Sequence, residues 1–181
     1  MKTNQHALII GGTGMLKMAS LSIIEQSRHA TLIARNLDRL EQIATKPNTS
    51  PIALNYNDSI NLQKKLKTAR HKNGYFDLAA IWIHSTAPNA AYIAAEFVEG
   101  DYYHILASSY AKPGHDNSER LNRFASFKKI SYHEVILGFV SAGGHSRWLS
   151  HSEISQGVLE ALDKKQKSFV VGTVRPWSAR P

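Results

Sequence analysis

The residues with the clearest chemical meaning form a glycine-rich segment near the start of the chain. The apolar run His6–Ile10 leads directly into Gly11-Gly12-Thr13-Gly14-Met15-Leu16, and a helix-forming segment follows. Glycines permit a tight turn and let the backbone approach a pyrophosphate, whose charge is attracted by free N–H groups at the start of a helix. We therefore predict that Gly11, Gly12, Thr13, Gly14, Met15 and Leu16 bind the phosphates of a dinucleotide. The alternative is a tight strand-to-helix connection that binds nothing.

Lys17 follows this segment, where the usual spacing would place a third glycine. Its ammonium group either reaches toward a phosphate or faces solvent.

The end of the second predicted strand favours one form of the cofactor. About twenty residues after the glycines, a carboxylate would bind the ribose 2′-hydroxyl of NAD. This chain has Ala34-Arg35-Asn36 there. A guanidinium pairs with a 2′-phosphate that a carboxylate would repel. Arg35 and Asn36 therefore predict NADP(H) rather than NAD(H), the alternative being an exposed arginine near Asp38.

Three polar clusters follow predicted strands, namely His84-Ser85-Thr86, Ser108-Ser109-Tyr110 and Gly143-Gly144-His145-Ser146-Arg147. Ligands of open parallel sheets bind at the carboxyl ends of the strands. A histidine can donate a proton near neutral pH, a serine can orient a carbonyl, and an arginine can hold a carboxylate or phosphate. We predict catalytic roles for Ser109, His84 and Tyr110, and substrate contacts for His145 and Arg147.

These assignments have structural alternatives. His84 could be a hydrogen-bonded histidine at a strand end, the two serines could cap a turn, and Arg147 could form a salt bridge with Glu153.

Apolar runs alternate with helix-period segments along the chain, which is typical of βαβ units. The predicted strands are His6–Ile10, Thr31–Ala34, Pro51–Asn55, Leu78–Ile83, Tyr103–Ala107, Tyr132–Leu137 and Phe169–Val174. The predicted helices are Met15–Gln26, Leu37–Ala44, Ile60–Arg70, Ala90–Phe97 and Glu153–Leu162, the last with Ser152 as its N-cap. The pattern predicts an α/β protein with a three-layer, doubly wound parallel sheet of about seven strands, a Rossmann fold.

Composition limits the function classes. The 181 residues carry 22 basic and 14 acidic side chains, for a net charge of +8, and contain no cysteine. Disulfides, thiolate metal sites and cysteine nucleophiles are excluded, which fits a cytoplasmic protein. The nine histidines are scattered without a metal-ligand spacing, so no metal is expected. No apolar run approaches the roughly 20 residues of a membrane span. We predict a single NAD(P)-binding domain over residues 1–181.

The densest basic run is Lys64–Lys72. Its apolar positions Ile60, Leu62, Leu66 and Ala69 recur at near-helical spacing. We interpret the run as the solvated face of an amphipathic helix rather than a nucleic-acid surface.

Together, Gly11-Gly12-Thr13-Gly14, Ala34-Arg35-Asn36 and the order of the elements resemble the short-chain dehydrogenase/reductase superfamily. The resemblance extends over nearly the whole chain. It implies that Asn55 and Tyr56 border the adenine, that Ile83 and His84 lie near the nicotinamide ribose, and that Ser109 matches the catalytic serine. It also implies that the backbone of Gly138, Phe139 and Val140 approaches the nicotinamide carboxamide.

The chain departs from this superfamily at the catalytic centre. None of its tyrosines is followed four residues later by lysine, so the usual Tyr-x-x-x-Lys proton relay is missing. The connections around the fifth strand are short, which reduces the helices that form the superfamily's usual dimer. The resemblance implies an atypical NADP(H)-dependent oxidoreductase of a small carbonyl or alcohol substrate. The substrate could be anionic, and a homodimer is the candidate assembly. The alternative is a protein that binds or senses NADP(H) without turnover.

Overall fold

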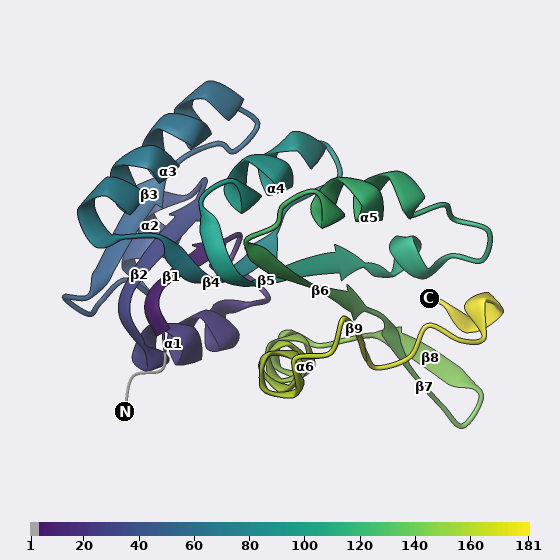
Figure 1. The fold of residues 1–181 in the computed structure, drawn as a ribbon. Coiled ribbons are helices and arrows are strands. Elements are labelled where there is room, and N and C mark those ends of the chain that lie inside the picture. The colour runs from purple at the N-terminus through teal and green to yellow at the C-terminus, as the bar shows by residue number, and fades with distance from the viewer. Residues whose placement is uncertain (1–3) are drawn as a thin grey trace.

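Seven parallel strands form the central sheet of the computed structural model, which describes residues 4–181. Their order across the sheet is β3-β2-β1-β4-β5-β6-β9 (Figure 1). In chain order they are β1 (Asn4–Ile10), β2 (Ser27–Ala34), β3 (Thr49–Ala53), β4 (Phe76–Trp82), β5 (Val98–Ala107), β6 (Ile130–Leu137) and β9 (Ser168–Val171). This arrangement confirms the predicted doubly wound α/β fold.

Helices cover both faces of the sheet (Figure 1). One face carries α1 (Lys17–Gln26) and α6 (His151–Lys164), and the other carries α3 (Ser59–Asn73), α4 (Pro88–Ala95) and α5 (Ser118–Ala125). Side chains of β1 alternate between the two cores, because Ile9 packs in one and Ile10 in the other. Both faces of the strands are therefore buried, which explains their continuous apolar runs.

Several predicted boundaries shift for physical reasons. The strand expected to run to Val174 ends at Val171, because the chain turns at Gly172, whose φ is +72°. The N-cap of α6 is Ser150 rather than Ser152: the Ser150 hydroxyl accepts a hydrogen bond from the Glu153 amide, and the Glu153 carboxylate accepts one from the Ser150 amide. Helix α6 therefore begins two residues before the predicted start at Glu153.

The segment after β6 is more ordered than a loop. Strands β7 (Phe139–Ala142) and β8 (His145–Trp148) form an antiparallel hairpin that turns at Gly143 and Gly144. Helix α5 and the short 3₁₀ helices η1 (Ser108–Ala111) and η2 (Trp177–Ala179) are also absent from the predicted elements, and α2 (Leu37–Glu41) is shorter than expected.

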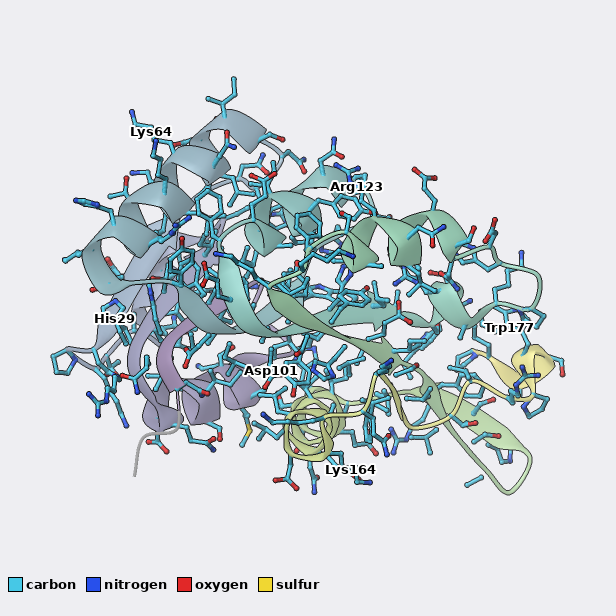
Figure 2. All side chains as sticks on the ribbon, in the orientation of Figure 1. His29, Lys64, Asp101, Arg123, Lys164 and Trp177 are labelled. Carbon is cyan, nitrogen blue, oxygen red and sulfur yellow. The ribbon has the colours of Figure 1, made fainter. Side chains whose placement is uncertain are left out.

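Helix α3 carries the basic run on its outer face, where Figure 2 shows Lys64 pointing away from the sheet. Leu62, Leu66 and Ala69 are buried as predicted, but Ile60 is 83% exposed and lies outside the apolar stripe. Within residues 4–181, no helix is long and apolar enough to cross a membrane.

Candidate functional site

A cavity of about 190 Å³ lies where the strand order reverses between β1 and β4. We call it the glycine-loop cavity. It brings together residues from the first half of the chain that were predicted to bind a cofactor, namely Gly11, Thr13, Gly14, Met15, Arg35, Asn36, Tyr56 and His84. Ala34, Arg39 and Trp82 complete its lining. The reversal point of a doubly wound sheet is the place where such folds bind their ligands.

The glycine loop is closely packed at its first two glycines and has open space at the third. Gly11 has a φ of +77°, and a Cβ there would lie 2.3 Å from the Trp82 carbonyl oxygen. A Cβ on Gly12 would lie 2.3 Å from the Ser20 hydroxyl oxygen, whereas a Cβ on Gly14 would meet no atom within 4 Å. Glycine is thus needed for packing at the first two positions, and Gly14 leaves free space beside the cavity.

Two serine hydroxyls form hydrogen bonds with the backbone of the glycine loop. The Ser20 hydroxyl donates a hydrogen bond of 2.9 Å to the Gly12 carbonyl, and the Ser155 hydroxyl of α6 donates one of 2.9 Å to the Met15 carbonyl. The loop is therefore held in place by contacts within the protein, which fits a preformed phosphate cradle.

Arg35 and Arg39 give the cavity its positive charge. Both side chains are exposed, and neither forms a salt bridge with any residue of the described chain, so Arg35 is not paired with Asp38. The Asn36 side chain accepts a hydrogen bond from the Arg39 amide and caps α2. Arg39 was not predicted to line the cavity. The signal in the sequence was a second arginine four residues after Arg35, directly beyond the second strand.

Other residues assigned to the cofactor lie near the cavity without lining it. Gly12 and Leu16 are buried beneath the loop, and Ile83 packs against the core. Asn55 is exposed, and its side-chain oxygen accepts a hydrogen bond from the Asn57 amide. Lys17 is exposed and does not line the cavity either.

A second cavity, of about 230 Å³, shares Trp82 with the first as a lining residue. We call it the strand-end cavity. It is lined by Trp82, Ala107, Ser108, Leu137, Gly138, Trp148, Leu149, Ile154 and Arg180. The hairpin and the C-terminal segment both run along this edge of the sheet (Figure 1), where Figure 2 labels Trp177. This cavity places the ends of β4, β5 and β6 around one space.

The serine that lines this cavity is Ser108. It is 2% exposed, and its hydroxyl oxygen accepts a hydrogen bond of 2.9 Å from Arg180 Nε. The predicted catalytic residue Ser109 is exposed and outside the lining, because η1 turns the chain immediately after β5. Tyr110 packs against His115 and beneath the guanidinium of Arg120, also away from the cavity. Neither residue lines the strand-end cavity.

His84 belongs to the glycine-loop cavity and not to the strand-end cavity. Its amide donates a hydrogen bond of 3.4 Å to the Tyr56 hydroxyl, and its ring centroid lies 5.9 Å from that of Trp82. Of the two roles predicted for His84, the structure supports contact with a cofactor better than proton donation to a substrate.

Arg147 has the structural role that was its alternative. Its two terminal nitrogens lie 2.8 and 2.9 Å from the two carboxylate oxygens of Glu153. This arginine is the main cause that lowers the pKa of Glu153 to about 2. His145 lies exposed in β8 and lines neither cavity. The hairpin residues predicted to hold a substrate therefore do not face the site.

Strand β7 also differs from what the resemblance implies. The Phe139 amide and carbonyl both pair with Thr173, at 2.8 Å each, so the amide is not available to a carboxamide and the carbonyl already accepts one hydrogen bond. A Cβ on Gly138 would lie 2.1 Å from the Thr173 carbonyl oxygen, and Val140 faces a different cavity beside α6. Gly138 alone of the three lines the strand-end cavity.

Among residues 4–181, no group of three or more histidine, aspartate or glutamate side chains is placed to hold a metal ion.

Comparison with known proteins reveals a shared fold. No protein-family profile matches the sequence, and no curated protein matches it significantly. A short-chain type dehydrogenase/reductase from Mycobacterium marinum superposes with a TM-score of 0.69 at 14% identity, over 95% of each chain. A mutant of a short-chain dehydrogenase/reductase from Serratia marcescens gives a TM-score of 0.65 at 13% identity, over 93% of this chain and 96% of the other. The predicted resemblance is thus confirmed for the fold, over most of the chain.

Proposed function

We propose that this protein binds NADP(H) in the glycine-loop cavity and transfers hydride between that cofactor and a small carbonyl or alcohol substrate in the strand-end cavity. The observation that carries the proposal is the adjacency of the two cavities across Trp82 at the carboxyl edge of the sheet. One cavity offers a glycine loop suited to phosphate and two guanidiniums that have no salt bridge among residues 4–181. The other is a mostly apolar space with few polar groups, as small-molecule sites usually are.

The glycine loop fits a pyrophosphate. Its backbone is fixed by Ser20 and Ser155, and Gly14 leaves open space where a side chain would otherwise stand. Arg35 and Arg39 supply the charge that a 2′-phosphate requires, so NADP(H) is the proposed cofactor and NAD(H) the weaker ligand.

Ser108 is the proposed group that orients the substrate. Its oxygen accepts the hydrogen bond from Arg180 Nε, which leaves the hydroxyl hydrogen free to donate to a carbonyl oxygen. When bound, a reduced nicotinamide supplies hydride to the carbonyl carbon, and the oxygen takes up a proton from solution. Donors aimed at an oxygen on which negative charge develops lower the barrier to such a step.

Titration of the protein with NADPH and NADH, followed by fluorescence, tests the cofactor. We expect NADPH to bind more tightly than NADH, and no binding of either below millimolar concentration would refute the proposal. Turnover is then measured by loss of NADPH absorbance against a panel of small aldehydes, ketones and 2-oxo acids.

The second candidate is NADP(H) binding without turnover. It is favoured by the missing Tyr-x-x-x-Lys pattern and by a strand-end cavity whose described lining contains no carboxylic acid, histidine, tyrosine or lysine. Tight NADPH binding with no consumption of cofactor across the whole panel would establish it.

A further inference from the structure

Arg180 is an exposed residue that lines the strand-end cavity and forms no salt bridge with any residue from 4 to 181. Its Nε donates to Ser108, and its guanidinium carbon lies 4.7 Å from the ring centroid of Trp148 and 5.2 Å from that of Trp177. Within the described chain its two terminal nitrogens form no hydrogen bond or salt bridge. The hydrogen bond to Ser108 and the two tryptophan rings position the guanidinium but leave its two terminal N–H groups free of partners among residues 4–181. Such a pair of N–H groups can bind a carboxylate with two parallel hydrogen bonds.

The surroundings of Arg180 favour an anionic ligand. No acidic side chain lines the strand-end cavity, so the charge of Arg180 is not neutralised there. The contrast with Arg147 is informative, because that arginine is already bound through both terminal nitrogens to Glu153. Of these two arginines, Arg180 is therefore the one whose terminal nitrogens remain available to a ligand.

The distance between Arg180 and Ser108 specifies the ligand further. Arg180 Nε and Ser108 Oγ are 2.9 Å apart, so a group bound by the Ser108 hydroxyl and one bound by the terminal nitrogens of Arg180 can belong to the same small ligand. In a 2-oxo acid the carbonyl and the carboxylate are bonded directly. Ser108 would then donate to the carbonyl oxygen while Arg180 holds the carboxylate.

We infer that Arg180 determines substrate specificity and that the strand-end cavity binds small 2-oxo acids or their 2-hydroxy counterparts. This inference rests on the proposed function for its catalytic meaning, but the anion site itself is testable without cofactor. Tryptophan fluorescence is a suitable readout, because two of the chain's three tryptophans line the cavity and the third flanks Arg180.

The experiment compares oxamate with oxamide, which have similar shapes and differ in the carboxylate. Both are titrated into the protein, first alone and then with saturating NADPH. We expect oxamate to bind to the wild type about 10-fold to 100-fold more tightly than oxamide, the range for a hydrogen bond to a charged group. Equal affinities, or no binding of either at millimolar concentration, would overturn the inference whatever the behaviour of any variant.

Variants then locate the site. Arg180→Gln should bring oxamate affinity down to that of oxamide, and Arg180→Lys should restore only part of it, because an ammonium lacks the planar fork. Arg175→Gln is the matched control: it removes an exposed arginine of the same segment that does not line the cavity. If Arg180→Gln retained full oxamate affinity at an unchanged melting temperature, the arginine would only anchor the C-terminal segment.

The two proposals fail separately. Selective oxamate binding in a protein that binds no NADPH would leave the anion site standing and remove the oxidoreductase function. NADPH binding without selectivity for oxamate would retain the cofactor site and remove the 2-oxo acid as the substrate class.

Discussion

Arg35 and Arg39 are the residues on which the cofactor assignment depends most directly. Both line the glycine-loop cavity, and neither has an acidic partner in the described chain. If they bind a 2′-phosphate, Arg35→Ala should weaken NADPH binding by about 1.5–3 kcal/mol and leave NADH nearly unaffected. Arg39→Ala should act in the same direction.

Calorimetric titration of both cofactors checks this prediction. Arg28→Ala is the control, since Arg28 is exposed at the start of β2 and lies at the opposite edge of the sheet. An equal loss of NADPH and NADH affinity would show that these arginines act on the adenine or on the fold instead of on the phosphate.

Gly14 and Gly11 should respond differently to substitution. A side chain at Gly14 has open space, so Gly14→Asp should leave the melting temperature nearly unchanged while its carboxylate repels a pyrophosphate and abolishes NADPH binding. Gly11→Ala should lower the melting temperature, because its Cβ would lie 2.3 Å from a backbone carbonyl at a φ of +77°. Unchanged NADPH affinity in a folded Gly14→Asp protein would move the phosphate site away from this loop.

At the scale of single elements, α6 depends on its first turn. The Ser150 side chain accepts from the Glu153 amide while Glu153 reaches back to the Ser150 amide, and Arg147 holds the same carboxylate from the hairpin. Ser150→Ala should therefore destabilise the protein by about 1 kcal/mol, whereas Ser152→Ala, at an exposed helical position, should have little effect. Urea denaturation of the two variants distinguishes the two caps, and equal losses would contradict the assignment.

This helix also supports the site. Through Ser155 it is hydrogen-bonded to the end of the glycine loop, and through Ile154 it lines the strand-end cavity. A weakened α6 is therefore expected to reduce ligand binding as well as stability.

For the whole molecule, two buried histidines predict sensitivity to acid. Burial lowers the pKa of His6 to about 4 and that of His104 to about 3. An unfolded histidine has a pKa near 6.5 and binds a proton below that pH. At pH values between about 4 and about 6.5, both histidines are therefore neutral in the folded protein and protonated in the unfolded chain. The unfolded state therefore gains protons first as pH falls, and stability declines from about pH 6.5 downward, by at most about 1.4 kcal/mol per pH unit for each histidine.

Denaturation in urea at about pH 7.5 and about pH 5 measures this decline. His104→Phe should reduce it, because phenylalanine cannot be protonated and is an aromatic ring like the imidazole that packs against Tyr102, Phe124 and Tyr132. The variant loses the hydrogen bond of 3.0 Å between His104 Nδ1 and the Tyr132 hydroxyl. The Tyr132 hydroxyl would keep its hydrogen bonds to Arg120 and Glu134. An identical pH dependence in the variant would mean that other groups control acid unfolding.

Local sequence was sufficient to predict the sheet and most of the residues that line the glycine-loop cavity. Continuous apolar strands alternating with amphipathic helices allow few topologies, and a glycine loop between the first strand and helix is a contiguous signal. The same holds for Arg35, which follows the second strand directly. In these cases the residues that act together are close in the chain, or are brought together by the ends of parallel strands.

The lining of the strand-end cavity could not be predicted in the same way, because it depends on contacts between distant parts of the chain. Ser108 and Arg180 are 72 positions apart, and they meet because β9 pairs with β6 and Thr173 then turns back to Phe139. Nothing near Arg180 in the sequence indicates that pairing. Whether Ser108 or Ser109 lines the cavity likewise depends on where η1 turns the chain. The role of Arg147 depends on the Glu153 carboxylate, which the hairpin brings within hydrogen-bond distance. Sequence alone determined the fold and the position of the glycine loop, whereas the tertiary structure decided which side chains line the strand-end cavity, because that lining depends on how the sheet edge, hairpin and C-terminal segment pack together.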